Sequence, residues 1–281
     1  MFDLVTYRGR ARVLLASAGA LFASAPSALA DPDPWADNVV SYDQGSNPGV
    51  GFTDPTTALG EPTRNTNLAS PFGGAVTPFQ SPFGTDEIVS IGEGGQLTVS
   101  FDEPIADDAA NPFGIDLLVF GNAFFFIDPF PDGVANGLGS EGGIIELSAN
   151  GSDYFTVTGV DADGLYPTNG FNDPSAAFTT GGVTATGTVP SDFTLPVDPS
   201  FNATGKSLSE IVAGYNGSGG GVGIDIASVG LSEVSFIRIS NPLESGVTPE
   251  IDGFADVAVP EPGSAVLLAL AGGVLLRRRK G

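Results

Sequence analysis

The sequence predicts an all-β protein built as an antiparallel sandwich. Its 281 residues include 40 glycines and 22 prolines, which is typical of many short strands joined by turns. From Gly95 to Phe101 apolar residues alternate with polar ones, the pattern of a strand with one buried face. Helical periodicity is nearly absent, and no repeat with a period of roughly 20 to 50 residues indicates a solenoid or a propeller.

Residues 1–30 are predicted to be a cleaved signal peptide. Basic residues precede a short apolar stretch from Val13 to Phe22. Ala28 and Ala30 then give the small-x-small pattern of a cleavage site, so the mature chain is expected to begin at Asp31. The alternative is an uncleaved anchor, which the short apolar stretch does not favour.

Residues 31–258 are expected to form one extracytoplasmic β domain. An irregular segment comes first and contains one helical turn, with Asp54 as its cap and Pro55 at its first position. The hydrophobic pattern then predicts strands at Ile88–Ile91, Gly95–Phe101, Ile115–Phe120, Ile144–Ser148, Tyr154–Thr158, Val234–Ile239 and Ile251–Val257.

Local signals predict one hairpin and one helix within this domain. Asn150-Gly151 separates two predicted strands and favours a tight turn between them. Ser207 and Glu210 have the spacing of a capping box, which predicts a short helix from about Leu208 to Ala213. Gly214 is expected to end that helix.

The C-terminal segment 259–281 has three parts in a fixed order. A proline-rich stretch is followed by an apolar run over residues 263–276 and then by four cations. The apolar run has about 14 residues, fewer than the roughly 20 that span a bilayer comfortably, so a short transmembrane helix is predicted. The basic end at residues 277–280 is expected to stay in the cytoplasm. The residues that define the tail are Pro260, Glu261, Pro262, Arg277, Arg278 and Arg279.

This tail resembles the PEP-CTERM sorting signal of bacterial surface proteins. The resemblance implies that an exosortase-type processing enzyme recognises Pro260, Glu261 and Pro262. It also implies transient anchoring in the inner membrane and a final location at the cell surface or in the extracellular matrix. A plain C-terminal anchor with a proline-rich entry is the alternative.

The middle of the chain carries a second resemblance, to secreted bacterial surface proteins that have the same tail. This resemblance implies a galactose-binding-like domain, which is a jelly-roll sandwich. Gly121 departs from the pattern, because those proteins have Glu before the Asn at this position. The segments that carry the resemblance are Val40–Tyr42, Leu59–Pro62, Leu118–Phe124, Ile145–Gly151 and Glu250–Val257.

The charge and the missing residue types limit the chemistry. Between Asp31 and Pro262 three cations stand against 32 carboxylates, a formal net charge of −29. Such a domain repels nucleic acid and anionic lipid and attracts cations. The absence of cysteine and histidine excludes thiolate nucleophiles, the Ser-His-Asp triad and ordinary zinc sites, so paired carboxylates are the main catalytic device left.

The excess of carboxylates has two explanations: solubility outside the cell, or the binding of calcium, a hard cation that takes carboxylate and carbonyl oxygens. Asp225, which follows a glycine-rich stretch, and Asp252, at the start of the last strand, are the candidate ligands. Asp161 and Asp163 alternate as in a calcium loop, but the later ligands of an EF-hand are missing, so a turn with solvated acids is expected there. The Phe124–Ile127 run is interpreted as a buried strand, with an aromatic binding platform as the alternative.

These observations together predict a non-catalytic, exported surface or matrix protein, with polysaccharide as the ligand class considered first. A calcium-stabilised structural adhesin is one alternative. A secreted glycoside hydrolase that uses two carboxylates is the other, although no spacing in the sequence selects a pair.

Overall fold

A computed structural model describes residues 33–67 and 73–257. The predicted signal peptide, with Ala28 and Ala30, lies outside the described residues, as does the whole predicted sorting tail. Within the described part of the chain, no helix is both long and apolar enough to cross a membrane.

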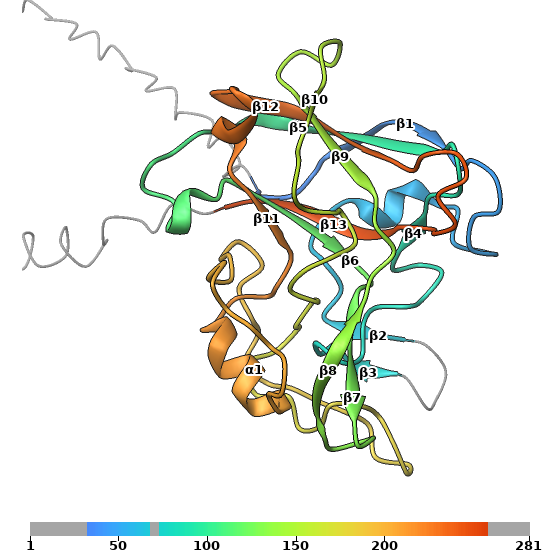
Figure 1. The fold of residues 1–281 in the computed structure, drawn as a ribbon, viewed down its shortest axis with the longest axis vertical. Coiled ribbons are helices and arrows are strands. Elements are labelled where there is room, and N and C mark those ends of the chain that lie inside the picture. Colours follow the sequence, from blue (N-terminus) through green and yellow to red (C-terminus); the bar gives the residue numbers. More distant parts are fainter. Residues whose placement is uncertain (1–32, 68–72, 258–281) are drawn as a thin grey trace, which may run out of the picture. The chain divides into compact units, whose positions relative to one another are not determined.

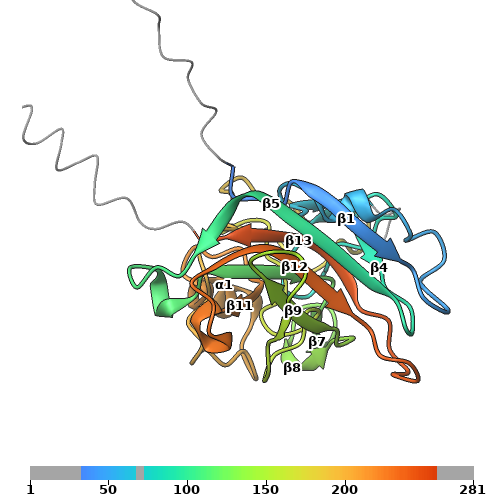
Figure 2. The ribbon, with the colours of Figure 1, turned by 90° about the horizontal axis from the view of Figure 1, so that it is seen from above.

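The described chain is mostly β, with antiparallel sheets and a single short α-helix (Figure 1). The larger sheet has five strands in the order β1 (Asn38–Asp43), β5 (Gln96–Ala106), β12 (Glu233–Ser240), β9 (Ile144–Ser148) and β10 (Phe155–Thr156). The second has four strands in the order β11 (Val222–Ile224), β6 (Leu117–Gly121), β13 (Glu250–Asp256) and β4 (Val89–Ser90). In the view from above, strands of the two sheets lie over one another (Figure 2).

Two small antiparallel pairs complete the strands. β2 (Asn65–Thr66) pairs with β3 (Gly74–Ala75), and β7 (Phe124–Asp128) pairs with β8 (Val134–Gly139). Single 3₁₀ turns form at η1 (Pro55–Ala58), η2 (Pro112–Gly114) and η3 (Ile226–Val229). The first of them confirms the predicted helical turn, because the Asp54 carboxylate accepts a hydrogen bond of 2.9 Å from the Thr56 amide.

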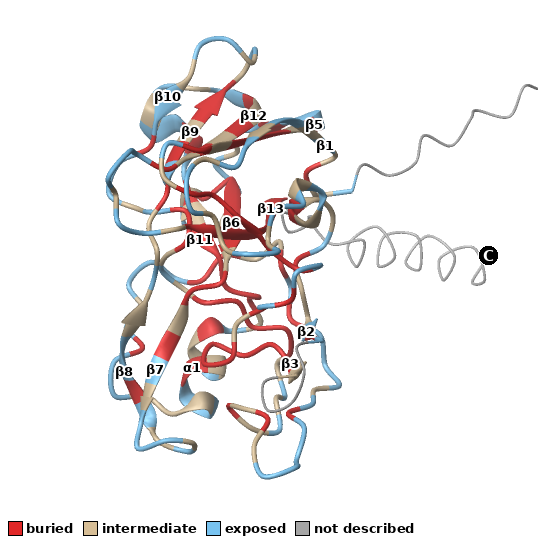
Figure 3. Ribbon diagram, turned by 90° about the vertical axis from the view of Figure 1, so that its right-hand side faces the viewer, coloured by how far each residue is buried: buried red, intermediate tan, exposed pale blue. Residues whose placement is uncertain are grey.

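One apolar cluster receives side chains from both larger sheets, and the buried residues are concentrated along their strands (Figure 3). In the five-stranded sheet the register places Ile237 opposite Val99 and Ile239 opposite Leu97. Each fully buried aliphatic side chain stabilises the fold by about 1.5–3 kcal/mol. The members that the second sheet supplies are Val89, Leu117, Val119, Val222, Ile224, Ile251 and Phe254.

Most predicted strands are present, with shifted ends. The predicted hairpin at Asn150-Gly151 is confirmed, since Phe155 pairs with Leu147 across it. The predicted strand at Ile115–Phe120 begins only at Leu117. β1 was not expected, because its residues are mostly exposed and show no alternation. Val39 and Tyr42 pack half-buried against the core, but a register shift between Val39 and Ser41 breaks the two-residue spacing that would reveal the strand.

The single α-helix of the described residues, α1 (Leu208–Tyr215), confirms the predicted capping box and start and corrects the predicted end. The Glu210 carboxylate accepts hydrogen bonds from the Ser207 amide at 2.9 Å and the Ser207 hydroxyl at 2.7 Å. The helix continues through Gly214 and ends at Asn216, which has a left-handed conformation with φ of 51°. Gly214 instead allows close packing, because a Cβ there would lie 2.0 Å from a ring carbon of Phe201.

The interpretation of residues 124–127 as a buried strand is correct for the strand and wrong for full burial. Phe125 is buried, whereas Phe126 is 51% exposed. Phe125 packs in a second apolar cluster with Phe79 and with Ile211 and Tyr215 of α1. The other side of β7 carries Phe124 and Phe126, whose rings meet edge to face with centroids 5.2 Å apart. The half-exposed strand arises because only one face of β7 meets the second cluster.

Candidate functional site

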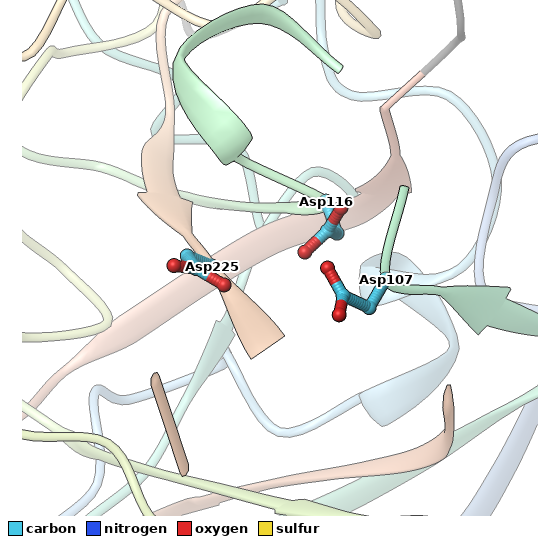
Figure 4. A group of neighbouring side chains, drawn as sticks. All are labelled: Asp107, Asp116 and Asp225. Carbon is cyan, nitrogen blue, oxygen red and sulfur yellow. The ribbon is translucent and has the colours of Figure 1, made fainter. Parts of the chain in front are cut away.

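Three aspartates from separate segments form a first acidic cluster (Figure 4). Asp107 follows β5, Asp116 precedes β6 and Asp225 follows β11. One carboxylate oxygen from each lies within 4.8 Å of the others, and Figure 4 shows the carboxylates of Asp107 and Asp116 directed toward each other. The structure therefore places Asp225, a predicted calcium ligand, beside two carboxylates that the sequence did not single out.

Asp116 is fully buried, and both of its carboxylate oxygens accept hydrogen bonds. Its Oδ1 accepts from the Asp108 amide at 3.1 Å and from Asn111 Nδ2 at 2.9 Å, and its Oδ2 accepts from the Ile226 amide at 3.1 Å. The carboxylate thus ties the loop after β5 and the η3 turn to the start of β6. Asp116 also affects the neighbouring Asp256. The burial of Asp256 is the main cause that raises its pKa to about 6, and the nearby Asp116 carboxylate adds to the rise.

Asp107 and Asp225 are exposed and lie at the surface of this cluster. Asp225 caps η3, with its carboxylate accepting from the Ala227 amide at 2.9 Å. Two exposed carboxylates beside a buried one form a solvent-accessible group of oxygen ligands, the kind that calcium prefers. Exposed acidic groups are also common on proteins without any metal, and Asp116 already has a structural role.

Asp252, the other predicted calcium ligand, belongs to neither acidic cluster of the described residues. It lies in β13, buried, and accepts hydrogen bonds from the Thr63 amide at 2.9 Å and the Thr63 hydroxyl at 2.7 Å. Burial is the main cause that raises the pKa of Asp252 to about 7, and the charge of Glu87 adds to the rise. The two hydrogen bonds from Thr63 lower the pKa but do not offset the burial. Asp252 therefore fastens the segment around Thr63 to β13.

A second acidic cluster contains Glu141, Asp163 and Glu250. The prediction of a turn with solvated acids is correct for Asp161, which is exposed, and wrong for Asp163, which is 0% exposed. Asp163 turns inward because its Oδ1 accepts from the Ala123 amide at 2.7 Å. The alternation of Asp161 and Asp163 was a weak signal for this cluster, and nothing local indicated Glu141 or Glu250.

An aromatic cleft of about 370 Å³ opens beside β7. Its walls are mainly apolar, and the ring of Phe83 is 43% exposed there. Aromatic contacts extend beyond it, since the rings of Phe178 and the exposed Phe130 have centroids 5.1 Å apart. The residues that line the cleft are Phe79, Gln80, Ser81, Phe83, Asn122, Phe124 and Phe178.

The sorting residues Pro260, Glu261, Pro262, Arg277, Arg278 and Arg279 lie outside the described residues. No protein-family model matches the chain, and none of the curated proteins compared with it matches its sequence.

Proposed function

We propose that this chain is a non-catalytic, exported surface or extracellular-matrix protein, sorted through its C-terminal tail. Support comes from the order of features along the sequence: an N-terminal export signal, an acidic β domain, and then a Pro-Glu-Pro stretch, a short apolar run and a basic end. An exosortase-type enzyme would recognise residues 260–262, while the predicted helix over residues 263–276 holds the chain at the inner membrane.

The β domain between these signals is proposed to be a jelly-roll sandwich of the galactose-binding-like kind. Two antiparallel sheets that share one apolar cluster support this assignment. The fold alone does not define a ligand, because the same architecture hosts unrelated functions. The ligand class depends instead on the side chains that a surface of the domain presents.

The aromatic cleft is the main support for the proposed ligand, a neutral polysaccharide. A binding site of this kind combines apolar walls with a few polar groups, and the cleft offers phenyl rings together with Asn122 and Ser81. The C–H faces of a sugar ring pack on aromatic faces, while its hydroxyls reach the polar groups. The net charge of −29 disfavours anionic polymers, so an uncharged chain fits the domain better.

Binding of the purified protein to neutral polysaccharides of its own matrix tests this proposal. Replacing Phe83 and Phe124 with alanine should abolish retention on a polysaccharide column. Replacing Phe113 and Phe155, two exposed phenylalanines away from the cleft, should leave retention unchanged. Equal retention of the two double variants, or no retention of the wild type on any native polymer, would contradict the proposal.

A calcium-stabilised structural adhesin is the second candidate, favoured by the cluster of Asp107, Asp116 and Asp225. Under this alternative, calcium raises the thermal stability of the protein while no polysaccharide binds. Magnesium at equal ionic strength should have a smaller effect, because it resists dehydration and requires near-octahedral geometry.

A further inference from the structure

The cluster of Glu141, Asp163 and Glu250 joins parts of the chain that are distant in sequence. Glu141 lies between β8 and β9, Asp163 lies in the loop after β10, and Glu250 is the first residue of β13. One carboxylate oxygen of each lies within 4.8 Å of the others. Three like charges at this separation repel one another unless protons or a cation intervene.

Burial makes the repulsion more severe in this cluster than in the first one. Asp163 is 0% and Glu250 is 7% exposed. Asp163 Oδ1 accepts a hydrogen bond of 2.7 Å from the Ala123 amide. The backbone amides of Glu141 and Glu250 are near enough to lower the pKa of Asp163, but no group among the described residues makes a well-formed hydrogen bond to the buried Oδ2. Native proteins rarely leave a buried carboxylate oxygen without a partner, because its desolvation is then uncompensated. This oxygen therefore points to a ligand.

Among the residues that the structure describes, no cationic side chain supplies the missing partner. Arg64 pairs with Glu61, Arg238 lies 3.5 Å over the ring of Tyr154, and Lys206 lies beside Phe201. The charged groups that act on Asp163 and Glu250 are carboxylates. Burial is the main cause that raises the pKa of Asp163 to about 7 and that of Glu250 to about 8, so both carboxyls retain protons more readily than exposed ones.

The neighbouring backbone leaves room for these oxygens. A Cβ at Gly121 would lie 2.6 Å from Asp163 Oδ1 and 2.8 Å from the backbone oxygen of Glu250, so a side chain there would displace them. Asn122 is nearly buried and hydrogen-bonds to the Glu250 carboxylate, which helps to hold that group in the cluster. Glycine at position 121 thus lets Asp163 and the start of β13 pack closely against the end of β6.

We propose that Glu141, Asp163 and Glu250 bind a calcium ion. Calcium is a hard cation that takes six to eight oxygen ligands at about 2.3–2.6 Å in flexible geometry, and water can complete its shell on the half-buried side of Glu141. The ion neutralises the repulsion and gives Asp163 Oδ2 its partner. It also joins the β8–β9 connection, the loop after β10 and the start of β13. This site does not depend on the polysaccharide proposal.

Calorimetric titration of the chelator-treated full chain with calcium chloride tests the site. The wild type should bind one calcium ion at this cluster. Asp163→Asn should weaken that binding by roughly tenfold or more, because affinity follows the number of charged ligands. Glu141→Gln, on a partly exposed side chain, should weaken it too without risk to folding. Asp225→Asn, in the other acidic cluster, should leave this binding event unchanged.

Magnesium provides a second readout. It resists dehydration and requires near-octahedral geometry, so it should bind this cluster more weakly than calcium does. The proposal is overturned if Glu141→Gln and Asp163→Asn both bind calcium as the wild type does, or if only Asp225→Asn loses binding. Calcium binding that magnesium matches at equal ionic strength would indicate screening of surface charge and would also overturn it.

Discussion

Asp252→Asn should reduce the pH dependence of the protein's stability. The buried carboxyl of Asp252 has its pKa raised from 3.8 to about 7, with burial as the largest cause. Between these two pKa values the native state holds a proton that the unfolded state has lost. The contribution of Asp252 to stability is therefore complete below pH 4 and is lost as the pH rises through 7. Asparagine resembles the protonated carboxyl in shape and does not titrate, so the variant lacks this contribution.

The size of the effect follows from the shift. Roughly three pKa units at about 1.4 kcal/mol each give about 4 kcal/mol in total. Between pH 5 and pH 8, where the unfolded carboxyl is already ionised, roughly 2–3 kcal/mol of this is lost. That is a large part of a typical unfolding free energy of about 5–15 kcal/mol. In a domain of this size it corresponds to roughly 5–10 °C in melting temperature.

Urea unfolding at several pH values, in the presence of a chelator, measures this difference. The single tryptophan, Trp35, bridges to Ala255 near the end of β13 and reports on the core through its fluorescence. The free energy of unfolding of the wild type should fall more steeply from pH 5 to pH 8 than that of Asp252→Asn. Asp132→Asn, which changes an exposed carboxylate, should have the wild-type slope.

The slopes of unfolding free energy against pH are compared, rather than its absolute values, because the amide introduced at position 252 also changes the hydrogen bonds with Thr63. Asp163, Glu250 and Asp256 also have raised pKa values and contribute the pH dependence that remains in the variant. Parallel profiles for the wild type and Asp252→Asn would refute the reasoning. A wild type that gains stability relative to the variant as the pH rises would refute it too.

Two further predictions concern the helix and the tail. Gly214→Ala should lower the melting temperature although alanine is the better helix former, because overpacking against Phe201 costs about 1–3 kcal/mol. Ser209→Ala, on the exposed face of the helix, is the control. A Gly214→Ala variant that is more stable than the wild type would show that Gly214 has no packing role. Glu261→Ala should leave the full-length chain in the inner membrane, as measured by cell fractionation and the mass of the C-terminal peptide, whereas a plain anchor predicts no change in location or mass.

The sequence by itself determined the features that depend on neighbouring residues. Alternation around Leu97 and Val99 identified the first half of β5, because a strand with one buried face repeats every two residues. The Asn150-Gly151 turn and the Ser207–Glu210 spacing located a hairpin and the start of α1. These signals work because turns and caps are stabilised by contacts within a few residues.

Only the tertiary structure decided which acids are buried and which lie together. Asp161 and Asp163 are both followed by small residues, yet the first is exposed and the second is buried against Glu250. Asp225 and Asp252 each follow an isoleucine, but one meets two carboxylates and the other a threonine. Burial and charge repulsion depend on segments that meet through sheet pairing and loop packing, and such meetings leave no pattern in the local sequence.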